Sequence, residues 1–396
     1  MLELLLNTTL KCGKPGPEGT GQQTSSDLPQ IPLHQVKSIF WKVFFFAFVI
    51  HMVTMTIYIA DNAMWANQIQ YFLNNNPAVF NFHAAYGHPG TTLVGLGSLF
   101  HILFGLSFST SLTLSAALLI AAATAACAAL CFLLQPQSLW WFTTGFILTL
   151  SRFYIDATPP TAAVMPFITL IVLTSCWLWG KNRSVSRCPY LLWGVILGLS
   201  AATRLDVSLL VGMPLFILLS YRSGIRVIVP IFIGGVVSFF IADPFLWFMP
   251  VQHVIDLFSK FTLHYSYLGA GRPLLWFEWV QGIPLALIAI TWFLILYLRR
   301  RLINVIPTQV LLVFLGISLL AVLMLTTSNF QAIRYLYPLI IVWEIFLPLF
   351  ALQSCPRKNY GQVSFMSGSL DAKTARVILG FIIPTQVIGY LYVFFI

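Results

Sequence analysis

Charged side chains are scarce in this sequence. Of its 396 residues only 8% are Asp, Glu, Lys or Arg, and just 11 are acidic, whereas 59% are hydrophobic. A water-soluble domain carries about 25% charged residues, so this class is excluded, and the mean hydropathy of +0.87 predicts an all-α polytopic membrane protein. Placing an ionised side chain near hydrocarbon costs about 2.5–3.5 kcal/mol of insertion free energy unless the group is paired or hydrated. The few acidic residues therefore mark candidate functional positions.

Cysteine is also uncommon, with six in the chain. Cys127, Cys131 and Cys176 fall in apolar runs, and the other three fall in segments that we expect on the cytoplasmic side. No disulfide is therefore expected on the outer side. Cys127 and Cys131 share a helix face at i, i+4 spacing, but without a nearby His or further thiolate they are interpreted as packing residues. We predict no metal site.

The basic residues give the chain a formal net charge of +10. They fall in short clusters between apolar runs, at about 37–42, 181–187, 222–226, 299–301 and 357–376. This distribution is typical of cytoplasmic loops, and it lacks the basic, aromatic-interleaved patch of a nucleic-acid-binding protein. We therefore predict that these clusters lie in the cytoplasm and that no nucleic acid is bound.

The apolar runs between the first two basic clusters predict one helix that does not cross the membrane. Two cytoplasmic clusters must be separated by an even number of crossings. The intervening sequence holds five runs, at about 43–60, 90–106, 112–134, 138–153 and 161–180. The run 90–106 is short and contains His101, so we expect a juxtamembrane helix on the outer surface, with 138–153 as the alternative. In both cases Asp61 and Asp156 face outward.

Further apolar runs bring the expected number of crossings to about eleven. We divide the chain into a disordered cytoplasmic tail (1–36), a transmembrane domain (37–353), and a cytoplasmic loop with a terminal transmembrane helix (354–396).

One predicted crossing is unusually short. Residues 190–203 supply about 21 Å of helix for a hydrocarbon core of about 30 Å. The turn after it, which carries Arg204 and Asp206, should therefore lie below the outer surface. Charged irregular backbone at that depth is tolerated only inside protein or beside a water-filled cavity, and we expect a cavity open to the outside.

Most polar side chains map to the same side of this topology. Those expected at or near the outer face are Asp61, Asp156, Arg204, Asp206, Asp243, His253, Asp256, Lys260, His264, Arg272, Glu278 and Arg334. Carboxylates beside Arg and His at a sunken cavity suit acid and base chemistry on a lipid-embedded substrate, with cations for a phosphate. A transporter vestibule could be lined in the same way.

Two of the carboxylates are candidate catalytic residues, although each also has a structural interpretation. Asp61, in ADNAMWANQ, is either a general base or the cap of a helix that begins near Ala63. Asp156, in SRFYIDATPP, is either a functional acid or a turn residue, and Arg152 lies one helical turn before it.

Two arginines are candidate phosphate ligands. Arg272 precedes Pro273 in an outer loop that also contains His264 and the flexible segment 269–271, and a guanidinium held there can bind phosphate bidentately. Arg334 opens RYLYP at the outer end of another run, where it is either a phosphate ligand or a snorkelling anchor.

At five stations, taken in order, the chain resembles the GT-C superfamily of membrane glycosyltransferases. Within it, the chain looks most like the bacterial relatives of dolichyl-phosphate-mannose protein mannosyltransferases and of the lipid A aminoarabinose transferase. The stations are ADNAMWANQIQYFLNNN, HisProGly at 88–90, SRFYIDATPP, GRPLLWFEWVQGIP and AIRYLYP. The chain departs from the family pattern at Asn62, where Glu is usual, at Trp65, where Tyr is usual, and at Gly90, where a second Pro is usual. It also lacks an Asp-x-Asp motif.

The resemblance implies a GT-C-like catalytic bundle that transfers a sugar, with inversion, from a polyprenyl-phosphate monosaccharide to an acceptor hydroxyl at the outer face. Asp61 aligns with the family's first-loop acid and would accept the acceptor proton, and Asp156 aligns with a second external acid. The residues expected to bind substrate are His88, Arg204, Asp206, His264, Arg272 and Arg334. We expect no cofactor; the lipid-linked donor is a substrate. The acceptor is expected to be a glycan, a lipid or a protein. The resemblance also implies a location in a bacterial inner (plasma) membrane.

Two other functions fit parts of the pattern. A transporter or lipid flippase needs ionisable groups near the midplane and access from both sides, whereas here they collect on one face. A glycan ligase or polymerase with a lipid-diphosphate donor would rely on Arg and His without a catalytic Asp. Activity that survives every outer Asp substitution but is lost in Arg272→Ala and His264→Ala would favour this enzyme.

Overall fold

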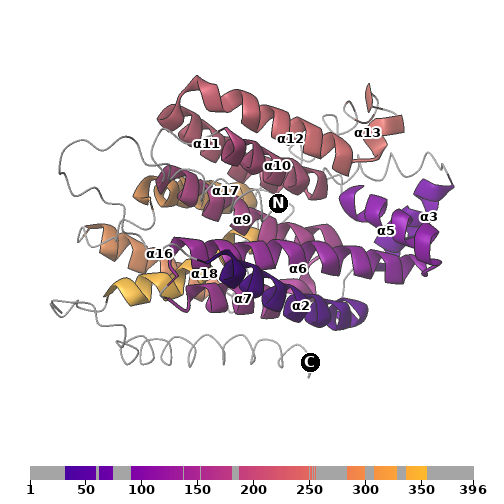
Figure 1. The fold of residues 1–396 in the computed structure, drawn as a ribbon, viewed down its shortest axis with the longest axis horizontal. Coiled ribbons are helices and arrows are strands. Elements are labelled where there is room, and N and C mark those ends of the chain that lie inside the picture. The colour runs from indigo at the N-terminus through magenta and orange to yellow at the C-terminus, as the bar shows by residue number, and fades with distance from the viewer. Residues whose placement is uncertain are drawn as a thin grey trace.

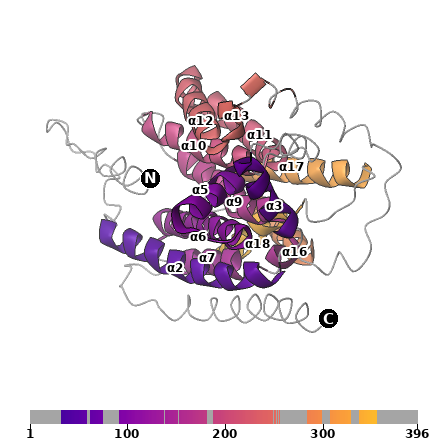
Figure 2. The same cartoon turned by 90° about the vertical axis from the view of Figure 1, so that its right-hand side faces the viewer.

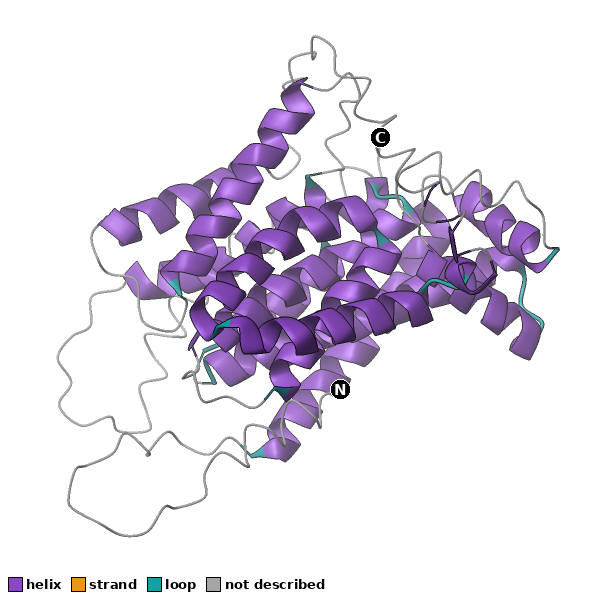
Figure 3. Ribbon diagram, turned by 90° about the horizontal axis from the view of Figure 1, so that it is seen from above, coloured by secondary structure: helices purple, strands orange, loops and turns teal. Residues whose placement is uncertain are grey.

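The computed structural model describes most of the predicted transmembrane domain. The described residues are 32–58, 62–74, 91–180, 187–255, 283–298, 307–327 and 336–354, apart from 137, 152, 249, 252 and 254. In these ranges the regular elements are helices and no strand occurs (Figure 3). The all-helical class is therefore confirmed for this part of the chain. Most of the predicted tail and the predicted terminal helix lie outside it.

The helices pack side by side into one bundle. In chain order they are α2 (Leu33–Tyr58), α3 (Asn62–Leu73), α5 (Thr91–Phe104), α6 (Phe108–Leu134), α7 (Trp140–Leu150), α8 (Phe153–Asp156), α9 (Pro159–Gly180), α10 (Cys188–Thr203), α11 (Leu205–Ser223), the 3-10 helix η1 (Ile225–Val227), α12 (Ile228–Ala242), α13 (Phe245–Phe248), α16 (Ile283–Leu298), α17 (Thr308–Thr327) and α18 (Tyr337–Ser354). Helices α3, α5 and α13 gather at one end, at the right of Figure 1 and facing the viewer in Figure 2. We call this the α3 end.

Several of these helices are long and apolar enough to cross a membrane. By length and composition they are Leu33–Thr54, Phe108–Leu134, Pro159–Gly180, Leu205–Ser223 and Ile225–Ala242. Shorter apolar helices are Thr92–Phe104, Trp140–Leu150, Cys188–Thr203, Leu285–Leu298, Thr308–Met324 and Tyr337–Phe350. Large apolar side chains such as Phe232 and Leu323 remain exposed, as expected of side chains that face lipid. These are the features of a helical membrane-embedded protein.

The two runs left open as non-crossing occupy different places. Helix α5 has only 14 residues, lies beside α3 at the α3 end, and stops at Gly105, whose positive φ of 63° favours glycine. Helix α7 instead packs against α6, α2 and α18 within the bundle. Both helices are short, with 14 residues in α5 and 11 in α7, and both pack against α6, so which of them fails to cross stays a prediction.

The centre of the bundle is formed by α6 and α9. Helix α6 begins after Ser107, whose hydroxyl accepts a hydrogen bond from the Thr110 N–H at 3.2 Å. Many small residues between 115 and 129 allow α2 and α9 to approach α6 closely. The most apolar stretch of α9 is entirely buried. Helix α9 also packs against both α10 and α11, the two helices on either side of the turn at Arg204.

The two cysteines of α6 are packed among neighbouring helices. The Cys127 thiol donates to the Pro166 carbonyl of α9 at 3.4 Å, and Cys131 Sγ lies 3.4 Å from Thr144 Oγ1 of α7. Both side chains are fully buried. These contacts support the interpretation of the pair as packing residues.

Helices α10 and α12 make an unusually close contact through glycines. A Cβ atom added at Gly194 would collide with the Ile231 carbonyl oxygen, and one added at Gly198 would collide with the Gly235 carbonyl oxygen. From the opposite side, the Ser238 hydroxyl of α12 donates to the Val195 carbonyl at 3.1 Å. This is small-residue packing of the kind that joins helices in membranes, and it fixes the α10–α11 turn relative to α12.

We expect Gly198→Ala to destabilise the bundle, because the added methyl group meets backbone that cannot move aside. Overpacking of this kind costs about 1–3 kcal/mol. Gly180→Ala is the matched control, since an added Cβ at Gly180 meets no atom within 4 Å. Thermal unfolding in detergent should show a lower Tm for Gly198→Ala and an unchanged Tm for Gly180→Ala. Equal Tm values would contradict the close contact.

Candidate functional site

A single arginine forms the turn between α10 and α11. Arg204 has extended backbone angles, φ −159° and ψ 107°, and its amide donates to the Ser200 carbonyl at 2.8 Å. The residue is only 1% exposed, although it carries a charge in an apolar bundle. The sequence predicted a turn at 203–206 that lies below the outer membrane surface; the structure shows a turn at Arg204 and buries this residue in the protein, and its depth in the membrane stays a prediction.

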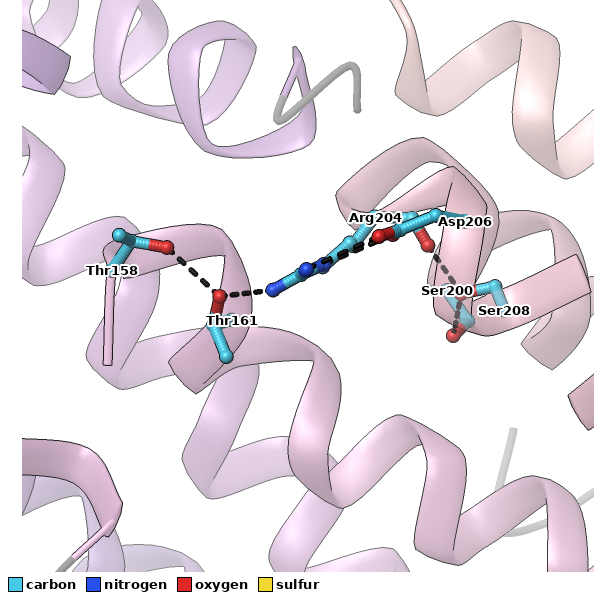
Figure 4. A network of polar contacts seen from close by, with 6 residues as sticks. All are labelled: Thr158, Thr161, Ser200, Arg204, Asp206 and Ser208. Atoms are coloured by element: carbon cyan, nitrogen blue, oxygen red, sulfur yellow. Dashed lines mark hydrogen bonds and ion pairs between the residues drawn. The ribbon is translucent and has the colours of Figure 1, made fainter. Parts of the chain in front are cut away.

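The guanidinium of Arg204 pairs with the carboxylate of Asp206, as Figure 4 shows. Arg204 Nε donates to Oδ1 at 2.9 Å and Nη2 donates to Oδ2 at 3.1 Å, so the pair is bidentate. Nη1 donates to the Thr161 hydroxyl of α9. A bidentate carboxylate satisfies the buried cation, and the N-terminal position of Asp206 on α11 adds a favourable interaction with the helix dipole.

Two serine hydroxyls hold the backbone of the turn. Ser208 Oγ donates to the Arg204 carbonyl at 2.6 Å, and Ser200 Oγ lies 2.7 Å from Ser208 Oγ. Both serines are fully buried. Because one comes from α10 and the other from α11, these hydrogen bonds tie the two helices together at the turn.

Thr161 connects this turn to the junction between α8 and α9. Its hydroxyl lies 2.8 Å from the Thr158 hydroxyl, and Thr158 follows two residues after Asp156, the last residue of α8 (Figure 4). Two stretches singled out in the sequence, SRFYIDATPP and the turn with Arg204 and Asp206, therefore meet in the folded protein.

Helix α8 also contacts the helices that lead toward two other candidate residues. The Tyr154 ring lies 4.6 Å from the His51 ring of α2, and α2 runs toward Asp61. The Phe153 ring stacks at 4.6 Å on Tyr337 of α18, three residues after Arg334. Helices α2 and α18 therefore both contact α8.

The structure describes three of the eight predicted site residues. Asp156 ends α8, and Arg204 and Asp206 form the pair above. The other five, Asp61, His88, His264, Arg272 and Arg334, lie outside the described residues. The Asp206 side chain is 33% exposed and that of Arg204 is 2% exposed, so Asp206 is the more accessible member of the pair.

The structure adds site residues that the sequence did not single out. The sequence does not distinguish Thr158 and Thr161, because hydroxyl residues beside a Pro pair are common at helix starts. Their place in the string DATPPT, directly after a candidate carboxylate, was the available signal. Within the described ranges, no group of three or more His, Cys, Asp or Glu side chains is placed to hold a metal ion.

Comparison with known proteins assigns no relative. No family model, curated protein or solved structure matches this chain. The site therefore has to be interpreted from its own chemistry: a partly exposed carboxylate, a buried arginine that holds it, and two threonine hydroxyls beside the end of α8.

Proposed function

We propose that this protein is an inverting glycosyltransferase that moves a sugar from a polyprenyl-phosphate monosaccharide to an acceptor hydroxyl. The observation that carries the proposal is the Arg204–Asp206 pair, which is joined through Thr161 to the junction that carries Asp156. A carboxylate accepts hydrogen bonds from sugar hydroxyls, and threonine hydroxyls can donate or accept them. In an apolar bundle with few acidic residues, this concentration of polar groups favours a binding site for a polar ligand on a lipid.

The proposed reaction is a single displacement. The Asp61 carboxylate accepts the proton of the acceptor hydroxyl, and the oxygen attacks the anomeric carbon. The bond from that carbon to the phosphate oxygen breaks, and polyprenyl phosphate leaves with the electron pair. The leaving group is already an anion, so it needs no proton, and cations such as Arg272 and Arg334 would stabilise its added charge. Asp156 and Asp206 would position the sugar or the acceptor.

The proposal includes a membrane arrangement. The chain would cross a plasma membrane about eleven times, with the α3 end facing the periplasm or exterior and α5 lying along that surface. Asp61 immediately precedes α3 and Asp156 ends α8, and the proposal puts both carboxylates on the outer side. The site would then lie where a lipid-linked donor presents its sugar.

A donor panel tests this function. The purified protein in lipid would be incubated with polyprenyl-phosphate monosaccharides and cell-envelope extract, and free polyprenyl phosphate would be followed by mass spectrometry. We expect release with one particular donor. If no donor of the panel releases polyprenyl phosphate but a lipid-diphosphate donor is turned over, the proposal would be replaced by a glycan ligase or polymerase. If no donor releases polyprenyl phosphate but a lipid or solute moves across the membrane of vesicles that contain the protein, the proposal would be replaced by a transporter.

A further inference from the structure

A second buried acid and base pair lies at the α3 end, where the chain leaves α12. His253 Nε2 lies 2.9 Å from Asp243 Oδ2, with His253 1% exposed and Asp243 fully buried. The other carboxylate oxygen, Oδ1, accepts the Phe245 N–H at 3.1 Å. Asp243 therefore bonds both to Phe245, near the start of residues 243–253, and to His253, at the end of this segment. We call residues 243–253 the corner.

The same corner contacts the first two helices of the α3 end. The Phe245 ring lies 5.8 Å from the His253 ring on one side and 5.0 Å from the Phe72 ring of α3 on the other. Pro244 lies against Gly95 of α5, where an added Cβ would come within 3.1 Å of Pro244 Cγ. A polar pair, an aromatic stack and a glycine contact thus join the end of α12 to α3 and α5.

We infer that Asp243 and His253 are positioning residues whose pair holds α3 against the end of α12. Asp61, the proposed base, directly precedes Asn62, the first residue of α3, in the sequence, so we expect a displaced α3 to disturb its function. His253 is too buried to exchange protons with a substrate, which argues against a catalytic role for it. This inference rests on the proposed function only for what Asp61 does. The corner itself is a separate structural statement.

A distance measurement tests the corner without an activity assay. Nitroxides would be attached to p-acetylphenylalanine at the exposed positions Gln70 of α3 and Val251 of the corner in the full chain, and their separation measured by pulsed electron resonance. His253→Phe keeps the ring over Phe245 but loses the hydrogen bond, so its distance distribution should be at least about twice as broad as that of the wild type. His253→Gln keeps a donor toward Asp243 and should stay narrow.

Two controls keep the test decisive. A label pair at the exposed positions Tyr221 and Ile233, away from the corner, should give the same distribution in every variant. If His253→Phe does not fold, Phe72→Ala removes the ring contact on α3 without leaving a buried charge unpaired, and it should broaden the first distance. An unchanged width in whichever of these variants folds, or equal broadening in His253→Gln, would overturn the inference.

Kinetics then connect the corner to Asp61. In His253→Phe, kcat for transfer should fall about 10–100-fold, because a displacement of about 1 Å at the reacting groups is enough for such a loss. KM for the donor should stay within about twofold, and His253→Gln should restore kcat. Broad distances with unchanged kcat would confirm the corner but remove its positioning role. Absence of transfer in the wild type would instead remove the proposed function and leave the distance result standing.

Discussion

Asp206→Ala should lose about 3–5 kcal/mol of folding stability, because it removes the carboxylate that accepts two hydrogen bonds from a buried guanidinium. Arg204 is 1% exposed and directs two of its nitrogens at Asp206. The Thr161 hydroxyl contacts a third nitrogen but carries no charge with which to neutralise the cation. Thermal unfolding in detergent, together with the yield of monodisperse protein, would measure the loss.

The double variant Arg204→Met/Asp206→Ala is the matched control. Removing both charges removes the ion pair as a unit, so most of the lost stability should return. The same variant should fold and yet fail to transfer sugar, since the carboxylate at the proposed site is gone. Asp206→Ala with the Tm of the wild type would show that water or another group satisfies Arg204, and would contradict the structural role given to the pair.

Asp61→Asn should reduce sugar transfer by about 10²–10⁴-fold, the range that a positioned general base contributes. The amide keeps the size of the side chain but cannot accept the acceptor proton. Donor binding, measured as protection of the fold by the donor alone, should persist. Asp371→Asn is the control, since Asp371 belongs to a segment expected in the cytoplasm. Full activity in Asp61→Asn would remove Asp61 as the base.

Local properties of the chain were predictable because they follow from composition and spacing. The low charge and long apolar runs predicted helices that pack in a membrane, and these helices are present throughout the described ranges. The start of α3 at Asn62 agrees with the helix expected near Ala63. A short apolar run followed by Arg and Asp predicted a sunken turn, and Arg204 is buried there. Each of these features depends on residues that are close in sequence.

Contacts between distant residues could not be predicted in the same way. Arg204 and Asp206 are only two residues apart, but their pairing needs the extended backbone at Arg204. In the folded protein this backbone occurs where the Arg204 side chain is buried against α9. Thr161 lies 43 residues before Arg204, and nothing in its own segment indicates that partner. The Asp243–His253 corner likewise depends on Phe72 and Gly95, which belong to helices much earlier in the chain.

The sequence by itself determined that this is a helical membrane protein, because hydrocarbon excludes charge and forces backbone groups to bond within helices. It also determined which few charged residues could matter, because each one in such a chain needs a partner or water. Only the tertiary structure decided which partner each charge has. That choice depends on how closely α9, α10, α11 and α12 approach one another, and the approach is set by glycines and small side chains whose neighbours are fixed only when the bundle is packed.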